Sequence, residues 1–211
     1  MTNVDWVAWH DSYDHPDSPL SRRLATVRRL ISEALDRAPE GPINIISACA
    51  GQGRDLNVAI AGHPRRGDTR ARLVELDPRN AERARADATA AGLSGVDVVT
   101  GDAARTDNYI GYAPAHLVLM CGVYGNISDA DVERTVGFCR QLTAAGGTVI
   151  WTRARWEPDL FPRICDWYEE RGFERLWVSE PVVGPGVGVH RFAGAPDPLE
   201  PGAVMFEFTR A

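Results

Sequence analysis

Short apolar runs alternate with longer helix-like segments along most of this chain. The runs are typical of strands that are buried on both faces of a parallel sheet, and they cover residues 43–48, 72–76, 96–100, 116–121 and 148–152. Between and after them the sequence predicts helices over 54–61, 78–91, from Ser128 past Cys139, and over 158–171. This alternation predicts an α/β fold with a doubly wound, mostly parallel sheet.

The two ends of the chain complete this organisation. Ser18 followed by Pro19 predicts the start of a further helix, and two more strands are expected over 173–178 and 203–209, which brings the sheet to seven strands. A long Gly/Pro-rich segment joins these last two strands. We therefore expect an aromatic-rich lead-in over residues 1–18 and a single domain over residues 19–211.

All 23 basic residues are arginine, and lysine is absent from the sequence. This excludes Schiff-base chemistry, lysine general bases and the lysine-dependent phosphate loop of the common nucleotide triphosphatases. The net charge of −6 would repel a phosphate backbone, so we expect a small-molecule partner and no nucleic acid.

Cellular location is inferred from apolar runs and cysteines. No apolar run approaches the roughly 20 residues that cross a bilayer, and residues 1–10 contain no basic segment of the kind that begins a signal peptide. The four cysteines, Cys49, Cys121, Cys139 and Cys165, are widely spaced and form no Cys-x-x-Cys pair. We therefore expect a cytoplasmic protein with reduced thiols, no membrane partner and no metal site.

Glycine and aspartate residues follow the predicted strands. They would lie at the carboxyl edge of the sheet, where parallel α/β sheets bind their ligands. Gly51 and Gly53 allow a tight turn after the first strand and a close approach of a ligand to the backbone. The alternative is that these glycines form a turn that only packs against its neighbours and binds no ligand. A dinucleotide fold would have a third glycine at Leu56, so the motif favours another adenosine-bearing ligand over a nicotinamide cofactor.

Two aspartates follow the next two strands. Asp77 could accept hydrogen bonds from both ribose hydroxyls, although Asp77 before Pro78 could equally cap the following helix. Asp102, before Ala103, could accept from an adenine amino group, or could be a solvated turn residue. With Gly51 and Gly53, these residues would form a cradle for one adenosine.

With these motifs, the sequence resembles the class I S-adenosylmethionine-dependent methyltransferases over about residues 20–211. The first motif of that family, acid-x-Gly-x-Gly-x-Gly, is matched from Ser47 to Gly53, with Ser47 in place of the acid and Cys49 in place of the first glycine. The closing strands resemble the family's antiparallel edge hairpin. The resemblance implies S-adenosylmethionine as cofactor, with these binding residues: Tyr13, Ser47, Ala48, Ala50, Gly51, Gly53, Asp77, Pro78, Asp102, Ala103, Cys121 and Gly122.

The resemblance also implies in-line methyl transfer to an acceptor held by the loops after the fourth and fifth strands and by the Gly/Pro-rich segment before the last strand. Tyr124 and His190 are candidate catalytic groups, and structural roles are the alternative for both. Candidate substrate-binding residues are Asn126, Arg153, Trp156 and Arg191. The aromatic lead-in, with Trp6, Trp9, His10 and Tyr13, could close over the site or could instead staple the first helix to the sheet.

Two other functions remain open at this stage. One is an adenosyl-cofactor binding protein without catalysis, which the substitutions Ser47 and Cys49 leave possible. The other is a nicotinamide-dependent oxidoreductase, which Leu56 disfavours. The sequence identifies neither the acceptor nor the oligomeric state, and a homo-oligomer is compatible with it.

Overall fold

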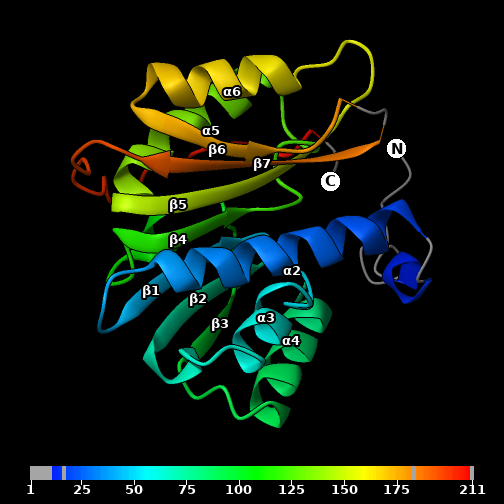
Figure 1. The fold of residues 1–211 in the computed structure, drawn as a ribbon, viewed down its shortest axis with the longest axis vertical. Coiled ribbons are helices and arrows are strands. Elements are labelled where there is room, and N and C mark those ends of the chain that lie inside the picture. The colour runs from blue at the N-terminus through cyan, green and yellow to red at the C-terminus, as the bar shows by residue number, and fades with distance from the viewer. Residues whose placement is uncertain (1–10, 16–17, 182–183, 210–211) are drawn as a thin grey trace.

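The computed structural model describes residues 11–15, 18–181 and 184–209, and this part of the chain forms one seven-stranded sheet with helices on both faces (Figure 1). In chain order the strands are β1 Ile43–Ala48, β2 Thr69–Glu75, β3 Val96–Thr100, β4 Ala115–Met120, β5 Thr143–Ala154, β6 Phe173–Val178 and β7 Pro185–Phe192. Their order in the sheet is β3-β2-β1-β4-β5-β7-β6. The predicted doubly wound α/β sheet is confirmed.

The direction of the strands sets the position of the crevice. Strands β1 to β5 pair in parallel, whereas β7 is antiparallel to both β5 and β6. Strand β1 lies between β2 and β4, so the order in which the chain adds strands reverses at this point. In such a sheet the connections on either side of the reversal run over opposite faces, and a crevice opens at the carboxyl ends of the strands.

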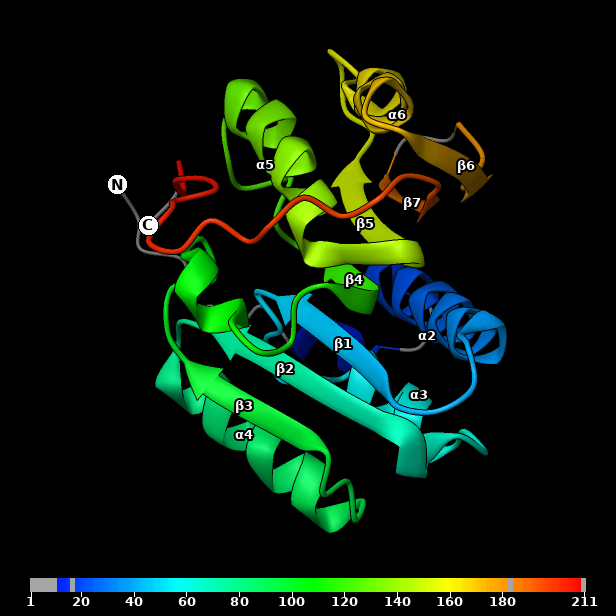
Figure 2. The same cartoon turned by 90° about the vertical axis from the view of Figure 1, so that its left-hand side faces the viewer.

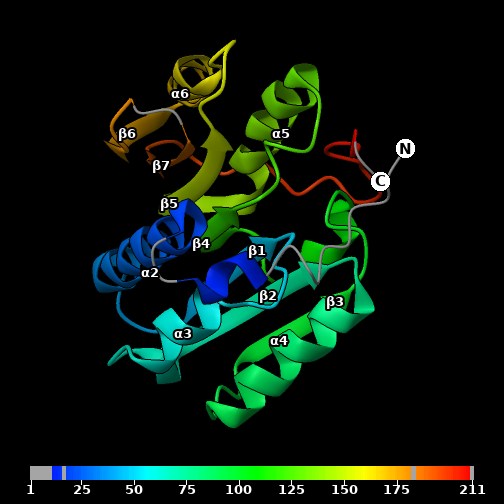
Figure 3. The same ribbon diagram turned by 90° about the vertical axis from the view of Figure 1, so that its right-hand side faces the viewer.

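Helices cover both faces of the sheet (Figures 2 and 3). Helices α2 Pro19–Arg37, α3 Leu56–Ala61 and α4 Pro78–Ala90 pack on one face, and α5 Asp129–Leu142 and α6 Phe161–Glu170 pack on the other. The short 3-10 helices are η1 Asp11–Asp14, η2 Arg66–Asp68 and η3 Thr106–Tyr109. None of the helices described is long and apolar enough to cross a membrane.

Local sequence signals explain where the main helices begin. The hydroxyl of Ser18 accepts a hydrogen bond from the backbone N–H of Ser21 at 3.0 Å, and Pro19 occupies the first turn of α2. In the same way Ser128 accepts from the backbone N–H of Asp131 at 3.1 Å and begins α5. Both predicted helix starts are confirmed.

The expected strand over 203–209 is wrong. The partner of β6 is β7, which lies inside the segment that we expected to be a Gly/Pro-rich connection. Residues 203–209 instead make isolated bridges, Arg105 with Val204 and Ile127 with Phe208. This tail runs past η3 and α5, where Met205 and Phe206 are buried, and it brings Phe208 to the crevice.

Two glycines within β7, Gly186 and Gly188, make its sequence look like a loop rather than a strand, and the structure explains why they are there. A Cβ atom on Gly188 would lie 2.3 Å from the ring of Trp151, and one on Gly186 would lie 2.7 Å from the ring of Phe161. Large aromatic side chains therefore occupy the space in which strand residues of β7 would carry their own side chains. Glycine at these positions allows the close approach of the backbone to the aromatic core.

Candidate functional site

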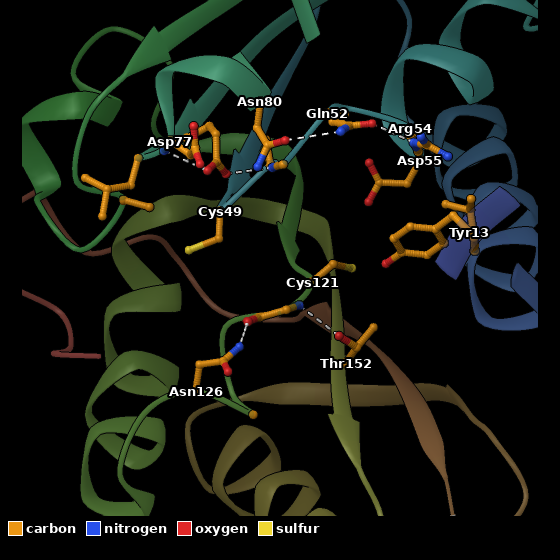
Figure 4. Close-up of a pocket in the computed structure, with 18 of the residues that line it drawn as sticks. Tyr13, Cys49, Gln52, Arg54, Asp55, Asp77, Asn80, Cys121, Asn126 and Thr152 are labelled. Atoms are coloured by element: carbon orange, nitrogen blue, oxygen red, sulfur yellow. Dashed lines mark hydrogen bonds between the residues drawn. The ribbon is translucent and has the colours of Figure 1, made fainter. Parts of the chain in front are cut away.

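A cavity of about 760 Å³ opens at the carboxyl ends of β1, β2, β4 and β5, where the strand order reverses (Figure 4). Its walls come from α2, from the β1–α3 turn, from the loops after β2, β4 and β5, and from the C-terminal tail. The lining is mostly apolar, with a few charged groups. Both its size and its position are typical of a small-molecule site.

The turn after β1 forms the floor of this cavity. Cys49, Gly51 and Gly53 all have positive φ, at 53°, 54° and 66°, so the turn depends on a left-handed backbone. A Cβ atom on Gly53 would lie 2.8 Å from Nδ2 of Asn57, which restricts this position to glycine. Cys49, Ala50 and Gly51 line the cavity directly.

Glu75, the last residue of β2, is a carboxylate in the cavity that our sequence analysis missed. Its side chain accepts hydrogen bonds from the backbone N–H groups of Gly51 at 2.8 Å and Asp77 at 2.9 Å. The residue is only 8% exposed, and burial raises the pKa of its carboxyl group. The sequence feature that could have identified Glu75 is its position as an acid at the end of a strand, two residues before the N-cap of α4 at Asp77.

Asp77 lines the cavity and also caps α4. Its Oδ1 accepts from the backbone N–H of Arg79 at 2.9 Å, and its Oδ2 pairs with the Arg79 guanidinium at 2.7 Å. The hydrogen bond from Arg79 lowers the pKa of Asp77. The capping role considered for Asp77 is therefore present in the structure, and Pro78 beside it also contributes to the cavity wall.

A chain of polar side chains holds the β1–α3 turn against its neighbours (Figure 4). Gln52 donates from Nε2 to Oδ1 of Asn80 at 3.2 Å and accepts from Nε of Arg54 at 2.8 Å. Arg54 continues to Asp14 of η1, with 2.6 Å between Nη1 and Oδ1. These contacts join the turn to α4 on one side and to the described part of the lead-in on the other.

Tyr13 brings the lead-in to the cavity. Its hydroxyl accepts a hydrogen bond from Nη2 of Arg23 on α2 at 2.5 Å, and burial raises the pKa of the phenol. Asp55, at the start of α3, lines the same end of the cavity, and burial raises the pKa of its carboxyl group too. Trp6, Trp9 and His10, the other aromatic residues of the lead-in that we considered, lie outside the described residues.

The opposite wall is formed after β4 and β5. The backbone N–H of Gly122 donates to Oγ1 of Thr152 at 2.9 Å, and Nδ2 of Asn126 donates to the Gly122 carbonyl at 2.7 Å. Arg153 donates to the carbonyl of Tyr124. Of the residues predicted for this wall, Cys121, Gly122, Asn126 and Arg153 line the cavity. Burial raises the pKa of the Cys121 thiol, which keeps it protonated at neutral pH.

The end of β3 contributes less than expected. Ala103 lines the cavity, but Asp102 is not among the lining residues. The carboxylate of Asp102 instead accepts from the backbone N–H of Ala104 at 2.9 Å, and its carbonyl accepts from Nδ2 of Asn108 at 2.8 Å. Three other predicted binding residues, Ser47, Ala48 and Gly53, are buried and do not line the cavity.

The two candidate catalytic residues require correction, because both side chains lie in the core. Tyr124 is 0% exposed, and its hydroxyl bonds the hydroxyl of Tyr168 at 2.5 Å on the α5–α6 face of the sheet. His190 is also 0% exposed, and its Nδ1 accepts from Nε1 of Trp151 at 3.1 Å. Neither lines the cavity. We expected Tyr124 in the loop after the fourth strand and His190 in the Gly/Pro-rich segment, but side-chain direction takes both into the aromatic core.

Two candidate substrate-binding residues also lie elsewhere. Arg191 pairs with Thr148, the first β5 residue of the β5–β7 ladder, and its guanidinium contacts Glu174 on the surface. It is therefore at the far end of the sheet from the cavity. Trp156 follows β5 but is 61% exposed and does not line the cavity. Among the residues described, no cluster of His, Cys, Asp and Glu could hold a metal ion.

The arrangement of strands is found in solved methyltransferase structures. An O-methyltransferase family protein from Burkholderia thailandensis matches with a TM-score of 0.67 and 17% identity, over 89% of this chain and 59% of that protein. Magnesium protoporphyrin IX methyltransferase from Synechocystis PCC 6803, solved with S-adenosylmethionine bound, matches with a TM-score of 0.65 and 11% identity, over 87% of this chain and 89% of that one.

A third structure shows the same architecture. Precorrin-6y C5,15-methyltransferase from Geobacter metallireducens GS-15 matches with a TM-score of 0.59 and 12% identity, over 80% of this chain and 88% of that one. This chain thus has the fold of the class I S-adenosylmethionine-dependent methyltransferases. No protein-family model matches the sequence, and no curated protein matches it. The names of the three proteins differ in what is methylated, so they identify no acceptor for this chain.

Proposed function

We propose that this protein is an S-adenosylmethionine-dependent methyltransferase that acts on a small-molecule acceptor. The observation that carries the proposal is the open cavity at the reversal of strand order, in which the buried carboxylate of Glu75 meets the glycine turn at Gly51. An acid beside a glycine turn at the carboxyl edge of the sheet is suited to an adenosine. The ribose hydroxyls need a hydrogen-bond acceptor, and the glycine lets the ligand approach the backbone closely.

The residues present fit such a ligand. Glu75 would accept hydrogen bonds from the ribose hydroxyls, and Ala50 and Gly51 leave room for the ligand against the backbone. Leu76 and Ala103 provide apolar walls for an adenine ring. We expect Asp77 to support the ribose side. Asp102 stays a prediction for the adenine amino group and would have to act from beside the cavity.

The acceptor would lie against the wall formed after β4 and β5. Cys121, Asn126 and Thr152 line this wall, and Phe208 closes it from the C-terminal tail. A bound sulfonium supplies an already activated methyl group. The protein then has to align the acceptor and exclude water, and such alignment can contribute about 7–11 kcal/mol to lowering a barrier.

Proton transfer would have few candidates in this cavity. None of the described histidines lines it, and the lining acids are Asp55, Glu75 and Asp77. An acceptor that loses its proton in solution would need no base from the protein. Arg153, beside the acceptor wall, is suited to hold a carboxylate or phosphate on the acceptor. The net charge of −6 favours a small molecule over a nucleic acid.

Calorimetric titration with S-adenosylmethionine and, separately, with NAD tests the proposal. We expect S-adenosylmethionine to bind and NAD not to bind, because Leu56 occupies the position at which a dinucleotide fold needs glycine. Binding of NAD alone would replace this proposal with that of an oxidoreductase. Glu75→Gln should weaken S-adenosylmethionine binding about tenfold, since a charge-assisted hydrogen bond is lost.

Catalysis is tested separately from binding. Incubation with methyl-labelled S-adenosylmethionine and a set of small acceptors that carry a carboxylate or phosphate should transfer label. A protein that binds S-adenosylmethionine but transfers no label to any acceptor would support the alternative of a binding protein without catalysis. Arg153→Gln is the matched variant, because it should raise the KM for an anionic acceptor without changing the affinity for S-adenosylmethionine.

A further inference from the structure

Two opposite charges line the same end of the cavity, away from Glu75. Asp55 stands at the start of α3, and Arg23 belongs to α2. Tyr13 of the lead-in contacts Arg23 at this end. Figure 4 shows the side chains of Asp55 and Tyr13 pointing toward the same space beside Cys121. Adenosine is uncharged, so it does not require a carboxylate and a guanidinium at this end of the cavity.

The carboxylate of Asp55 has no ion-pair partner in the described part of the chain. Its Oδ1 accepts from the backbone N–H of Leu56 at 2.7 Å. Arg23 and Arg28 are both close enough to attract it, but neither forms an ion pair with it, and the Arg28 guanidinium donates to the carbonyl of Arg54 at 2.9 and 2.7 Å. A half-buried carboxylate with only backbone donors is costly, and a cation that entered the cavity would offset this cost.

Arg23 is the complementary group. Its Nη2 donates to the hydroxyl of Tyr13, and no carboxylate of the described residues lies within ion-pair distance of its guanidinium. A guanidinium has five N–H donors in a fixed planar fork, which suits it to a carboxylate. The cavity thus presents one group for an ammonium and another for a carboxylate.

An α-amino acid carries both of these ions on one carbon. The family resemblance places an acid at position 47, but this chain has Ser47 there, and Ser47 is buried in β1 outside the cavity lining. We propose that Asp55 and Arg23 form the subsite for the α-amino acid end of the cofactor, with Asp55 accepting from the ammonium and Arg23 donating to the carboxylate. Tyr13 is a positioning residue that orients Arg23. This inference rests on the proposed function.

The test compares two adenosine ligands, one with the α-amino acid group and one without it. S-adenosylhomocysteine has the amino acid group, and 5′-methylthioadenosine lacks it. Asn is a good helix N-cap, so Asp55→Asn removes the charge while keeping the start of α3. By calorimetry we expect Asp55→Asn to weaken S-adenosylhomocysteine about tenfold or more and to leave 5′-methylthioadenosine unchanged within about twofold. Asp87→Asn, in an exposed ion pair on α4, is the control and should change neither affinity.

A second pair of ligands tests Arg23. Decarboxylated S-adenosylmethionine keeps the ammonium and lacks the carboxylate. Arg23→Gln should weaken S-adenosylmethionine about tenfold and leave the decarboxylated ligand unchanged. If Asp55→Asn and Arg23→Gln weaken both members of each pair equally, the two residues act only on the fold of the cavity and the inference is overturned, while the proposed function stands. If the wild-type protein binds none of the four ligands, the proposed function itself fails.

Discussion

The backbone N–H of Gly51 donates a hydrogen bond of 2.8 Å to Oε2 of Glu75, which joins the turn after β1 to the last residue of β2. The other carboxylate oxygen of Glu75 accepts from the backbone N–H of Asp77 at 2.9 Å. One buried side chain therefore holds both loops that form the floor and one wall of the cavity. This arrangement makes Glu75 a structural residue as well as a candidate ligand residue.

We expect Glu75→Ala to lower the free energy of unfolding by about 1–3 kcal/mol, because two backbone donors lose their acceptor. Urea unfolding of the variant and the wild type measures this loss. Glu75→Gln keeps the shape and one acceptor oxygen, so its stability should lie between the two. Equal stability of all three proteins would mean that water replaces the carboxylate without cost.

Asp77→Ala should lower the free energy of unfolding by about 1 kcal/mol through loss of the α4 cap. Asp77→Asn should not, since asparagine caps as well as aspartate. We also expect Asp77→Ala to weaken S-adenosylmethionine less than Glu75→Gln does, because the Asp77 carboxylate is already paired with Arg79. Calorimetry on the three variants checks the order, and a reversed order would make Asp77 the principal ribose ligand.

Gly188→Ala is expected to destabilise the fold by about 1–3 kcal/mol or more, since the new methyl group would enter the space of the Trp151 ring. Thermal unfolding of the variant measures the effect. Gly67→Ala is the control, because no atom lies within 4 Å of a Cβ placed there. A Gly188 variant as stable as the Gly67 variant would show that the ring can move aside.

Tyr124→Phe should cost about 1 kcal/mol of stability, because the Tyr168 hydroxyl loses its hydroxyl partner at 2.5 Å and keeps only the weaker contact with Sγ of Cys139 at 3.4 Å. The affinity for S-adenosylmethionine should not change, because the lost hydroxyl faces the core. Chemical unfolding and calorimetry on the same preparation separate the two effects. A large loss of methyl transfer with unchanged stability would restore Tyr124 as a catalytic candidate.

Burial lowers the pKa of His190 from 6.5 to about 3. Between these values the unfolded chain binds a proton that the folded chain excludes, so stability should decrease as the pH falls below 6.5, by up to about 1.4 kcal/mol per pH unit. Urea unfolding at several pH values should show a smaller slope for His190→Gln, which retains an acceptor for Trp151. A wild-type slope in His190→Gln would show that this histidine does not carry the pH dependence.

Much of the fold could be predicted because its signals are local. Ser18 and Ser128 cap their helices through their own neighbours, and the apolar strands need only short runs of sequence. Strand β7 could not be predicted in this way. Gly186 and Gly188 look like loop residues, and only the distant rings of Phe161 and Trp151 explain why glycine is needed there.

The site was predicted as far as backbone position determines it. Gly51, Cys121 and Gly122 line the cavity because they follow strands whose ends meet at one edge. Side-chain direction was harder to predict. Glu75 and Asp77 are both acids of one β–α junction, and the choice between them depends on which carboxylate turns toward Gly51. Side-chain direction was also decisive for Tyr124 and His190, because their contacts with Tyr168 and Trp151 turn them into the core.

The position of β7 between β5 and β6 has a consequence for biosynthesis. In the described part of the chain β6 pairs only with β7, although β6 is made first. A nascent chain that has reached Val178 therefore has an edge strand with no neighbour, and β5 offers a free edge beside it. Both edges can be satisfied only after Phe192 has left the ribosome. During this interval exposed strand edges are open to wrong pairing, so slow translation or chaperone binding over residues 179–192 would affect the yield of native protein.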